Sequence, residues 1–188
     1  MGEGFFKSIQ ENPIIAAVNN EDNLEKAIES PSNIIFLLTG NIFNLSYMVN
    51  AIKNNDMDVY IHVDLIEGFS KDIVALDYIN KNIKPDGIIT TKNNLIRYAK
   101  NIGIFAIQRL FLLDSLSLET GIKSIKSMRP NAIELLPGVM PKVTKIIHEK
   151  TNVPVITGGL IMDKSDVINS LRAGAIGIST SKEDIWYM

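Results

Sequence analysis

The sequence contains no cysteine, which excludes disulfides, thiolate nucleophiles and cysteine-based zinc sites. Long apolar runs are also missing, since none approaches the roughly 18 residues of a membrane-spanning helix. The N-terminal residues, with Glu3, Glu11 and Pro13, lack the basic and apolar regions of a signal peptide. We therefore expect a cytoplasmic protein without a membrane segment.

The chain also lacks a large excess of positive or negative charge, because 19 basic and 21 acidic residues leave a net charge of −2. This balance gives no general attraction to nucleic acid or to anionic membranes, so a polyanionic partner would need a local basic face. Hydrophobic residues make up 46% of the 188 residues, and charged residues 21%. This composition is typical of a globular protein, and without a linker or low-complexity stretch it predicts one domain over residues 1–188.

Short apolar segments alternate with amphipathic ones along the whole chain. The amphipathic segments begin near Asp22, Leu45, Lys71, Asn93, Ser115, Met140 and Asp163. The apolar segments are expected strands, at Ile14–Val18, Asn33–Leu38, Val59–Asp64, Gly87–Thr91, Ile104–Arg109, Ala132–Leu136, Val153–Thr157 and Ala175–Ser179. This alternation indicates an α/β fold with a parallel sheet covered on both faces. Eight strands favour one compact (β/α)8, TIM-barrel-like domain, with an open doubly wound sheet as the alternative.

The last two strand ends have the composition of a phosphate site. Gly158 and Gly159 follow one strand, and the next ends in the hydroxyl-rich run Ser179, Thr180 and Ser181, shortly before a final helical turn. Glycine lets the backbone approach an anion closely, and the loops after strands 7 and 8 of such barrels frequently bind phosphate. The alternative is that the two glycines serve only a tight turn.

Several other polar residues are expected at the same mouth. Arg109 and Glu134 lie on neighbouring strands and are either ligand contacts, a structural ion pair, or both. Asp64 either binds a polar ligand or caps its turn, and His62 is either a contact or a core histidine. Thr91 and Gly138 are further candidate contacts. A metal site of His62, Asp64 and Glu134 is the weakest alternative, and we predict no metal, no cofactor and no catalytic residue.

These residues lie in segments that resemble the glycerol uptake operon antiterminator family, the GlpP proteins. The matching segments are His62–Gly68, Pro85–Thr91, Ala106–Ser115, Glu134–Gly138, Gly158–Ile161 and Thr180–Ser181. The resemblance implies a cytoplasmic, TIM-barrel-like transcription regulator that responds to glycerol 3-phosphate. It also implies binding to the mRNA leader of glycerol uptake and catabolic operons, which prevents premature termination.

The sequence itself offers only a modest RNA-binding face. Basic residues gather around the two helices expected after strands 5 and 6, at Lys123, Lys126, Arg129, Lys142, Lys145 and Lys150. They either contact RNA phosphates or form the solvated sides of amphipathic helices.

Two readings other than a non-enzymatic regulator stay open. One is a small barrel enzyme acting on a glycerol or triose phosphate, and the other is a binding module whose phosphate site only stabilises the fold. We expect no membrane partner, and the sequence leaves a homo-oligomer open.

Overall fold

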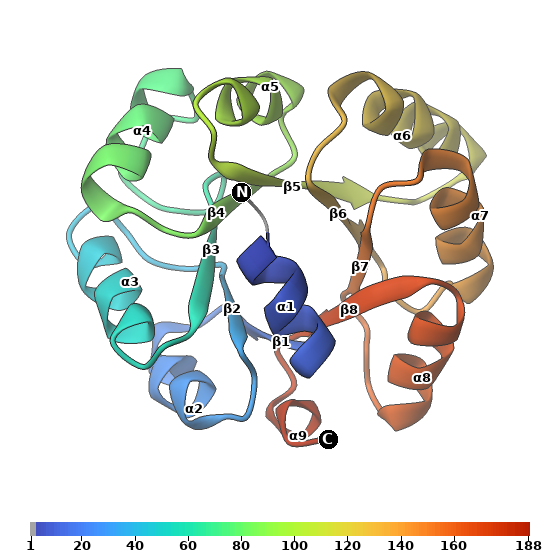
Figure 1. Cartoon of the computed structure of the whole chain (residues 1–188), viewed down its shortest axis with the longest axis horizontal. Helices are drawn as coiled ribbons and strands as arrows, with labels where there is room; N and C mark the ends of the chain where they lie inside the picture. The colour runs from blue at the N-terminus through green and yellow to red at the C-terminus, as the bar shows by residue number, and fades with distance from the viewer. Residues whose placement is uncertain (1–2) are drawn as a thin grey trace.

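Eight parallel strands close into a barrel in the computed structural model, which describes residues 3–188 (Figure 1). The strands are β1 Ile14–Val18, β2 Ile34–Leu37, β3 Asp58–His62, β4 Gly87–Thr90, β5 Phe105–Phe111, β6 Ala132–Leu136, β7 Val155–Gly158 and β8 Ala175–Thr180. Each strand pairs with the next in sequence, and β8 pairs with β1 through Ile15 and Ser179. The predicted closed barrel is confirmed, and the open sheet is wrong.

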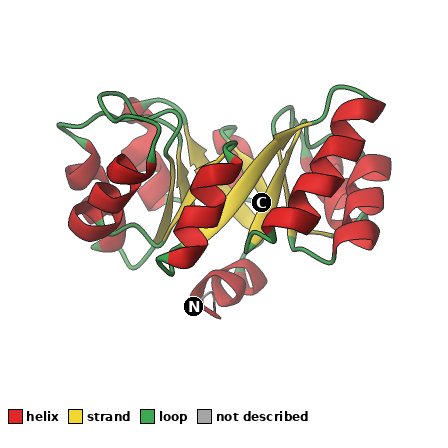
Figure 2. Ribbon diagram, turned by 90° about the horizontal axis from the view of Figure 1, so that it is seen from above, coloured by secondary structure: helices red, strands yellow, loops and turns green. Residues whose placement is uncertain are grey.

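Helices surround the strands, as Figure 2 shows from the side. They are α2 Leu24–Glu29, α3 Leu45–Lys53, α4 Ile73–Tyr78, α5 Asn93–Asn101, α6 Ser115–Met128, α7 Pro141–Thr151, α8 Lys164–Arg172 and α9 Glu183–Trp186. Their starts follow the sequence signals closely. Asp72, Asp114 and Asp163 cap α4, α6 and α8 by accepting hydrogen bonds from amides of the first helical turn.

Helix α1 (Glu3–Glu11) was not expected from the sequence, and it lies across the N-terminal end of the barrel (Figure 1). Its Phe5 and Ile9 are buried in the barrel's interior. The Phe5 ring lies 4.8 Å from that of Phe105 and 5.2 Å from that of Tyr60, measured between centroids. This aromatic cluster therefore fills the N-terminal end of the barrel's interior.

Strand limits differ from expectation at three functional positions. β3 ends at His62, so Asp64 lies in the following turn rather than on the strand. β5 continues to Phe111, which places Arg109 inside the strand. β7 begins at Val155 instead of Val153, because the intervening Pro154 has no amide to donate to a neighbouring strand. In residues 3–188 the structure contains no helix long and apolar enough to cross a membrane.

Candidate ligand-binding site

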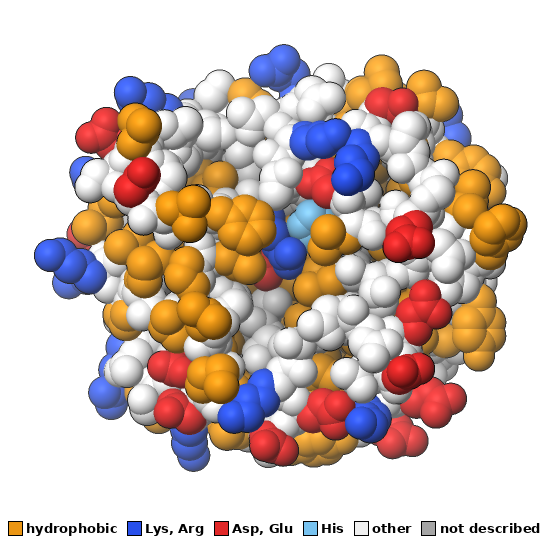
Figure 3. All heavy atoms as spheres, turned by 180° about the vertical axis from the view of Figure 1, so that it is seen from behind, with side chains coloured by type: hydrophobic (Ala, Val, Ile, Leu, Met, Phe, Trp, Pro, Cys, Tyr) orange, Lys and Arg blue, Asp and Glu red, His pale blue; other side chains and the backbone are white. Residues whose placement is uncertain are grey.

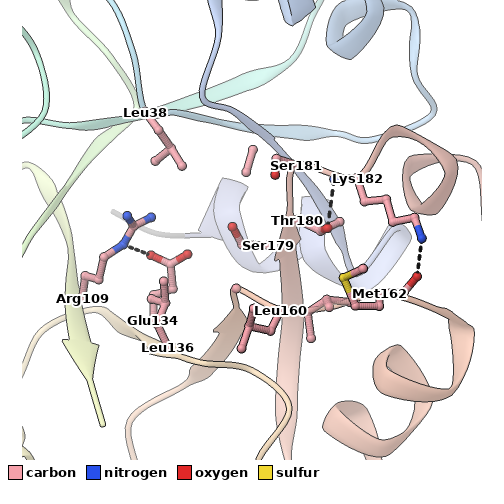
Figure 4. Close-up of a pocket in the computed structure, with 13 residues that line it drawn as sticks. Leu38, Arg109, Glu134, Leu136, Leu160, Met162, Ser179, Thr180, Ser181 and Lys182 are labelled. Carbon is pink, nitrogen blue, oxygen red and sulfur yellow. Dashed lines mark hydrogen bonds and ion pairs between the residues drawn. The ribbon is translucent and has the colours of Figure 1, made fainter. Parts of the chain in front are cut away.

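A cavity of about 380 Å³ opens at the C-terminal end of the barrel (Figure 4). It lies over β1, β5, β6, β7 and β8, and its walls combine apolar side chains with a few polar groups. The lining residues are Ala17, Leu38, Arg109, Glu134, Leu136, Gly159, Leu160, Ile161, Met162, Ser179, Thr180, Ser181 and Lys182. Such a wall of apolar surface with few polar groups is typical of a small-molecule site.

An ion pair forms one side of the cavity. Arg109 on β5 and Glu134 on β6 are register partners, and Arg109 Nε donates a 2.6 Å hydrogen bond to Glu134 Oε2. Both side chains are buried from solvent, with exposed fractions of 6% and 1%. In Figure 4 the terminal guanidinium nitrogens of Arg109 point away from Glu134 and into the cavity. The pair therefore leaves the terminal guanidinium nitrogens of Arg109 directed into the cavity.

The ends of β7 and β8 form the opposite side. Within residues 3–188, no main-chain oxygen accepts a hydrogen bond from the amides of Gly159, Leu160 or Ser181. The hydroxyls of Ser179 and Ser181 make no hydrogen bond with the other cavity residues (Figure 4). Thr180 Oγ1 accepts a hydrogen bond of 3.1 Å from the amide of Lys182. Amides and hydroxyls at strand ends provide the donors that an anion requires.

Two of the predicted glycines have packing roles beside the cavity. A Cβ on Gly158 would lie only 2.9 Å from Glu134 Oε1, so the absence of a side chain at Gly158 makes room for the glutamate carboxylate. A Cβ on Gly138 would lie 3.0 Å from the amide nitrogen of Gly158. Gly138 also donates to the carbonyl of Gly159 at 3.0 Å. Gly138 thus packs against the end of β7 and does not line the cavity.

Asp64 lies outside the cavity lining and is bound by its own neighbours. Its carboxylate accepts hydrogen bonds from the Thr90 hydroxyl at 2.9 Å, from the Thr91 amide at 2.8 Å and from the Thr91 hydroxyl at 2.9 Å. Burial opposes ionisation, but these hydrogen bonds outweigh it and hold the pKa of Asp64 below its usual value. Asp64 therefore caps the end of β4 rather than its own turn, and it joins the ends of β3 and β4.

His62 is buried at the end of β3 and does not line the cavity either. Burial lowers its pKa to about 4, and the neighbouring Arg109 guanidinium contributes to the decrease. Its Nδ1 has no hydrogen-bond partner within residues 3–188. His62 is thus buried, as the core-histidine alternative expects, but its Nδ1 is not satisfied by another group of the described chain.

Some of the predicted ligand-binding residues therefore line the cavity, and others do not. It brings Arg109, Glu134, Gly159, Thr180 and Ser181 to one cavity, with Gly158 directly beneath, and it leaves His62, Asp64, Thr91 and Gly138 outside the lining. Sequence reasoning missed Leu38, Met162 and Lys182. The signal for Lys182 was its place directly after Ser181, and its Nζ donates to the Met162 carbonyl at 2.7 Å.

The candidate RNA-contact residues are exposed, but they form two groups. Parallel strands alternate with helices, so α6 and α7 both run from the mouth toward the α1 end of the barrel. Lys123, Lys126 and Arg129 lie toward the far end of α6, whereas Lys142 and Lys145 lie near the mouth. Lys100 of α5 joins the first group, since its Nζ donates to the Arg129 carbonyl at 2.6 Å.

A metal site is not supported at the mouth, because within residues 3–188 no three His, Asp or Glu side chains converge as metal ligands. Glu134 is paired with Arg109, and Asp64 with two threonines. The weakest alternative from the sequence thus has no geometric basis.

Comparisons with known proteins agree with this architecture. Residues 14–186 match the model of a family described as glycerol-3-phosphate responsive antiterminators. YgcP of Escherichia coli (strain K12), described as uncharacterized, is 40% identical over 178 residues, which are 95% of this chain and 93% of YgcP.

Two solved structures are also similar. The glycerol uptake operon antiterminator regulatory protein of Listeria monocytogenes str. 4b F2365 is 35% identical, with a TM-score of 0.90 over 93% of this chain and 95% of that one. A glycerol uptake operon antiterminator-related protein of Thermotoga maritima MSB8 is 32% identical, with a TM-score of 0.84 over 93% of this chain and 98% of that one.

Proposed function

This chain belongs to the family of glycerol-3-phosphate responsive antiterminators, and from that premise we propose that glycerol 3-phosphate binds in its mouth cavity as an effector. The liganded protein then binds the mRNA leader of glycerol uptake transcripts and prevents early termination. The observation that carries the proposal is the cavity itself, where free amides and hydroxyls of β7 and β8 face the Arg109–Glu134 pair.

The β7 and β8 ends suit the phosphate. The amides of Gly159, Leu160 and Ser181 have no main-chain acceptor in the described chain, and Gly159 adopts a φ of +73°. This left-handed conformation, natural for glycine, turns the chain at the end of β7. Unpaired amides together with the Thr180 and Ser181 hydroxyls supply directed donors to phosphate oxygens.

The Arg109–Glu134 pair suits the glycerol end. One carboxylate oxygen of Glu134 accepts from Arg109, which leaves lone pairs on the other for a ligand hydroxyl, while terminal guanidinium nitrogens donate to hydroxyl oxygens. A ligand lacking these hydroxyls leaves buried charged groups unpaired, which is costly. The pair therefore selects glycerol 3-phosphate over inorganic phosphate or a simple alkyl phosphate.

Calorimetric titration of the full chain with glycerol 3-phosphate tests the site. We expect binding to the parent chain and to the Thr120→Ala variant, because Thr120 is an exposed residue of α6 that does not line the cavity. Thr180→Ala should bind more weakly by roughly tenfold, the equivalent of about one net hydrogen bond. If both Thr180→Ala and Arg109→Ala bound glycerol 3-phosphate with unchanged affinity, the ligand would have to bind outside this cavity.

Gel-shift titration with glycerol-operon leader RNA tests the regulatory half. We expect leader binding that strengthens with glycerol 3-phosphate, and by linkage RNA must strengthen ligand binding by the same factor. If the protein bound glycerol 3-phosphate but no leader RNA, it would be a binding module rather than an antiterminator. Conversion of a glycerol or triose phosphate by the protein would instead identify the enzyme that the sequence left open.

A further inference from the structure

A patch of exposed apolar side chains lies beside the cavity, from the end of β5 to the first turn of α6 and on the loop that follows β7. It consists of Phe111, Leu113, Leu116, Leu160 and Met162, and we refer to these residues as the mouth patch. Leu113 is 86% exposed and Leu116 is 71% exposed. Figure 3, which views the mouth, shows hydrophobic side chains gathered on one side of the central hollow. Large contiguous apolar patches on a soluble surface usually mark an interface.

The two halves of the patch are physically joined through β6. The amide of Leu112 donates to the carbonyl of Leu136 at 2.8 Å, which fixes the β5 loop against the end of β6. The Leu136 side chain in turn packs beneath Gly159, where a Cβ would lie 3.3 Å from Leu136 Cδ2. The apolar surface therefore continues from Leu113 across Leu136 to Leu160.

A groove of about 260 Å³ lies directly beside the protruding leucines. Its lining residues are Leu112, Leu113, Asp114, Ser115, Leu118, Met140 and Val143. Protruding side chains and a groove on one face are what a two-fold interface needs, because each copy inserts its own side chains into the partner's groove. We propose that the mouth patch and this groove are the docking surface for a second copy of this chain.

Charge supports a second copy as the partner. A two-fold contact brings identical residues close together, so a charged patch would repel itself. Residues 111–118 contain one charged residue, Asp114, whose carboxylate accepts from the Ser117 amide at 2.7 Å as the cap of α6. Residues 159–162 contain none. By contrast, the groove between α2 and α3 carries Glu21, Asp22 and Glu25 and would repel its own copy.

RNA is the less suitable occupant of this surface. Single-stranded RNA is held by aromatic stacking and by basic side chains, yet Phe111 is the one aromatic residue of the patch, and the other four are leucines and a methionine.

A second copy also has a consequence for the cavity, because Leu160 and Met162 belong to both the patch and the cavity wall. The partner would cover the cavity opening.

Sedimentation velocity of the full chain without ligand tests the proposal. We expect the parent protein to approach twice the 20.9 kDa mass of one chain as its concentration rises. Leu116→Asp should remain at the mass of one chain, because the new carboxylates meet across the two-fold contact. The matched control is Val74→Asp, since each residue is second in a helix capped by aspartate and the two are similarly exposed, at 71% and 73%.

A parent protein that keeps the mass of one chain at every concentration would overturn the proposal. So would a Leu116→Asp/Leu113→Asp variant that still forms dimers, because both substitutions place charge on the proposed surface. Loss of leader RNA binding in this double variant, with the parent protein monomeric, would assign the patch to RNA instead. The two sedimentation outcomes are measured without ligand, so they are independent of whether glycerol 3-phosphate binds the cavity.

Discussion

Arg109 and Glu134 face each other at the same register position on neighbouring strands, with 2.6 Å between Arg109 Nε and Glu134 Oε2. Their burial removes two charges from water, which costs several kcal/mol per ion and is only partly offset by their attraction. Apolar residues of similar size would hold the barrel at least as well. This cost supports the proposed ligand-binding role of the pair, which the next experiment separates from a purely structural one.

Replacement of the whole pair separates stability from binding. We expect Arg109→Met combined with Glu134→Leu to leave the free energy of unfolding unchanged or higher, and to abolish glycerol 3-phosphate binding. Arg109→Ala alone should lower the free energy of unfolding by about 3 to 5 kcal/mol, because Glu134 stays buried without its partner. Urea unfolding and calorimetry measure the two effects. Tight ligand binding by the double variant would show that the pair is only structural.

Gly158 controls the position of the Glu134 carboxylate. An added methyl in Gly158→Ala would stand 2.9 Å from Glu134 Oε1, so we expect the carboxylate to shift and ligand affinity to fall at least tenfold, about 1.4 kcal/mol. Gly121→Ala on α6 is the control, because its nearest neighbour would lie 3.6 Å away. That helical change should raise stability by about 1 kcal/mol and leave affinity unchanged. Equal affinities in the two variants would contradict the assigned role of Gly158.

His62 should make stability depend on pH. Its pKa is lowered from 6.5 to about 4 in the folded state, so between these values the unfolded chain binds a proton that the folded chain does not. Stability is therefore complete above about pH 6.5 and falls as the pH decreases toward 4, by up to about 1.4 kcal/mol per pH unit. Urea unfolding at several pH values should show this slope in the parent chain.

His62→Gln provides the reference for that slope, because glutamine is polar but does not titrate. Other groups titrate in both proteins and cancel in the comparison, including Asp58, whose pKa is raised by burial. Asp64 has a lowered pKa and loses its contribution only at still lower pH. Parallel stability curves for the two proteins would show that His62 is not a buried neutral residue.

The barrel could be predicted because its signals are local and repeated. Each apolar segment is followed by a helix start such as Asp114 or Asp163, and eight such units leave few alternatives. Helix α1 escaped prediction because its role depends on tertiary contacts. Nothing local in Phe5 or Ile9 indicates that they fill the end of a barrel formed by later residues.

The site was predicted less completely, for a geometric reason. Strand ends identify which residues lie near the mouth, but not which side chains turn toward each other. Asp64 was a candidate ligand contact, yet β3 ends two residues earlier than expected, and Thr90 and Thr91 bind the Asp64 carboxylate. Leu38 and Met162 were missed because an apolar residue beyond a strand end gives no signal of whether its side chain turns toward the cavity.

Lysines on α7 provide the sharpest test of RNA contact. Lys145 and Lys7 both form a 3.9 Å helical ion pair with a glutamate four residues later, but they lie at different ends of the barrel. We expect Lys145→Ala to weaken leader RNA binding for all leader sequences and to reduce the salt dependence by about one phosphate contact, whereas Lys7→Ala on α1 changes neither. Fluorescence anisotropy at several salt concentrations measures both quantities. Equal salt dependence in the two variants would remove the α7 surface from the RNA interface, and Lys126→Ala would then report on the α6 group.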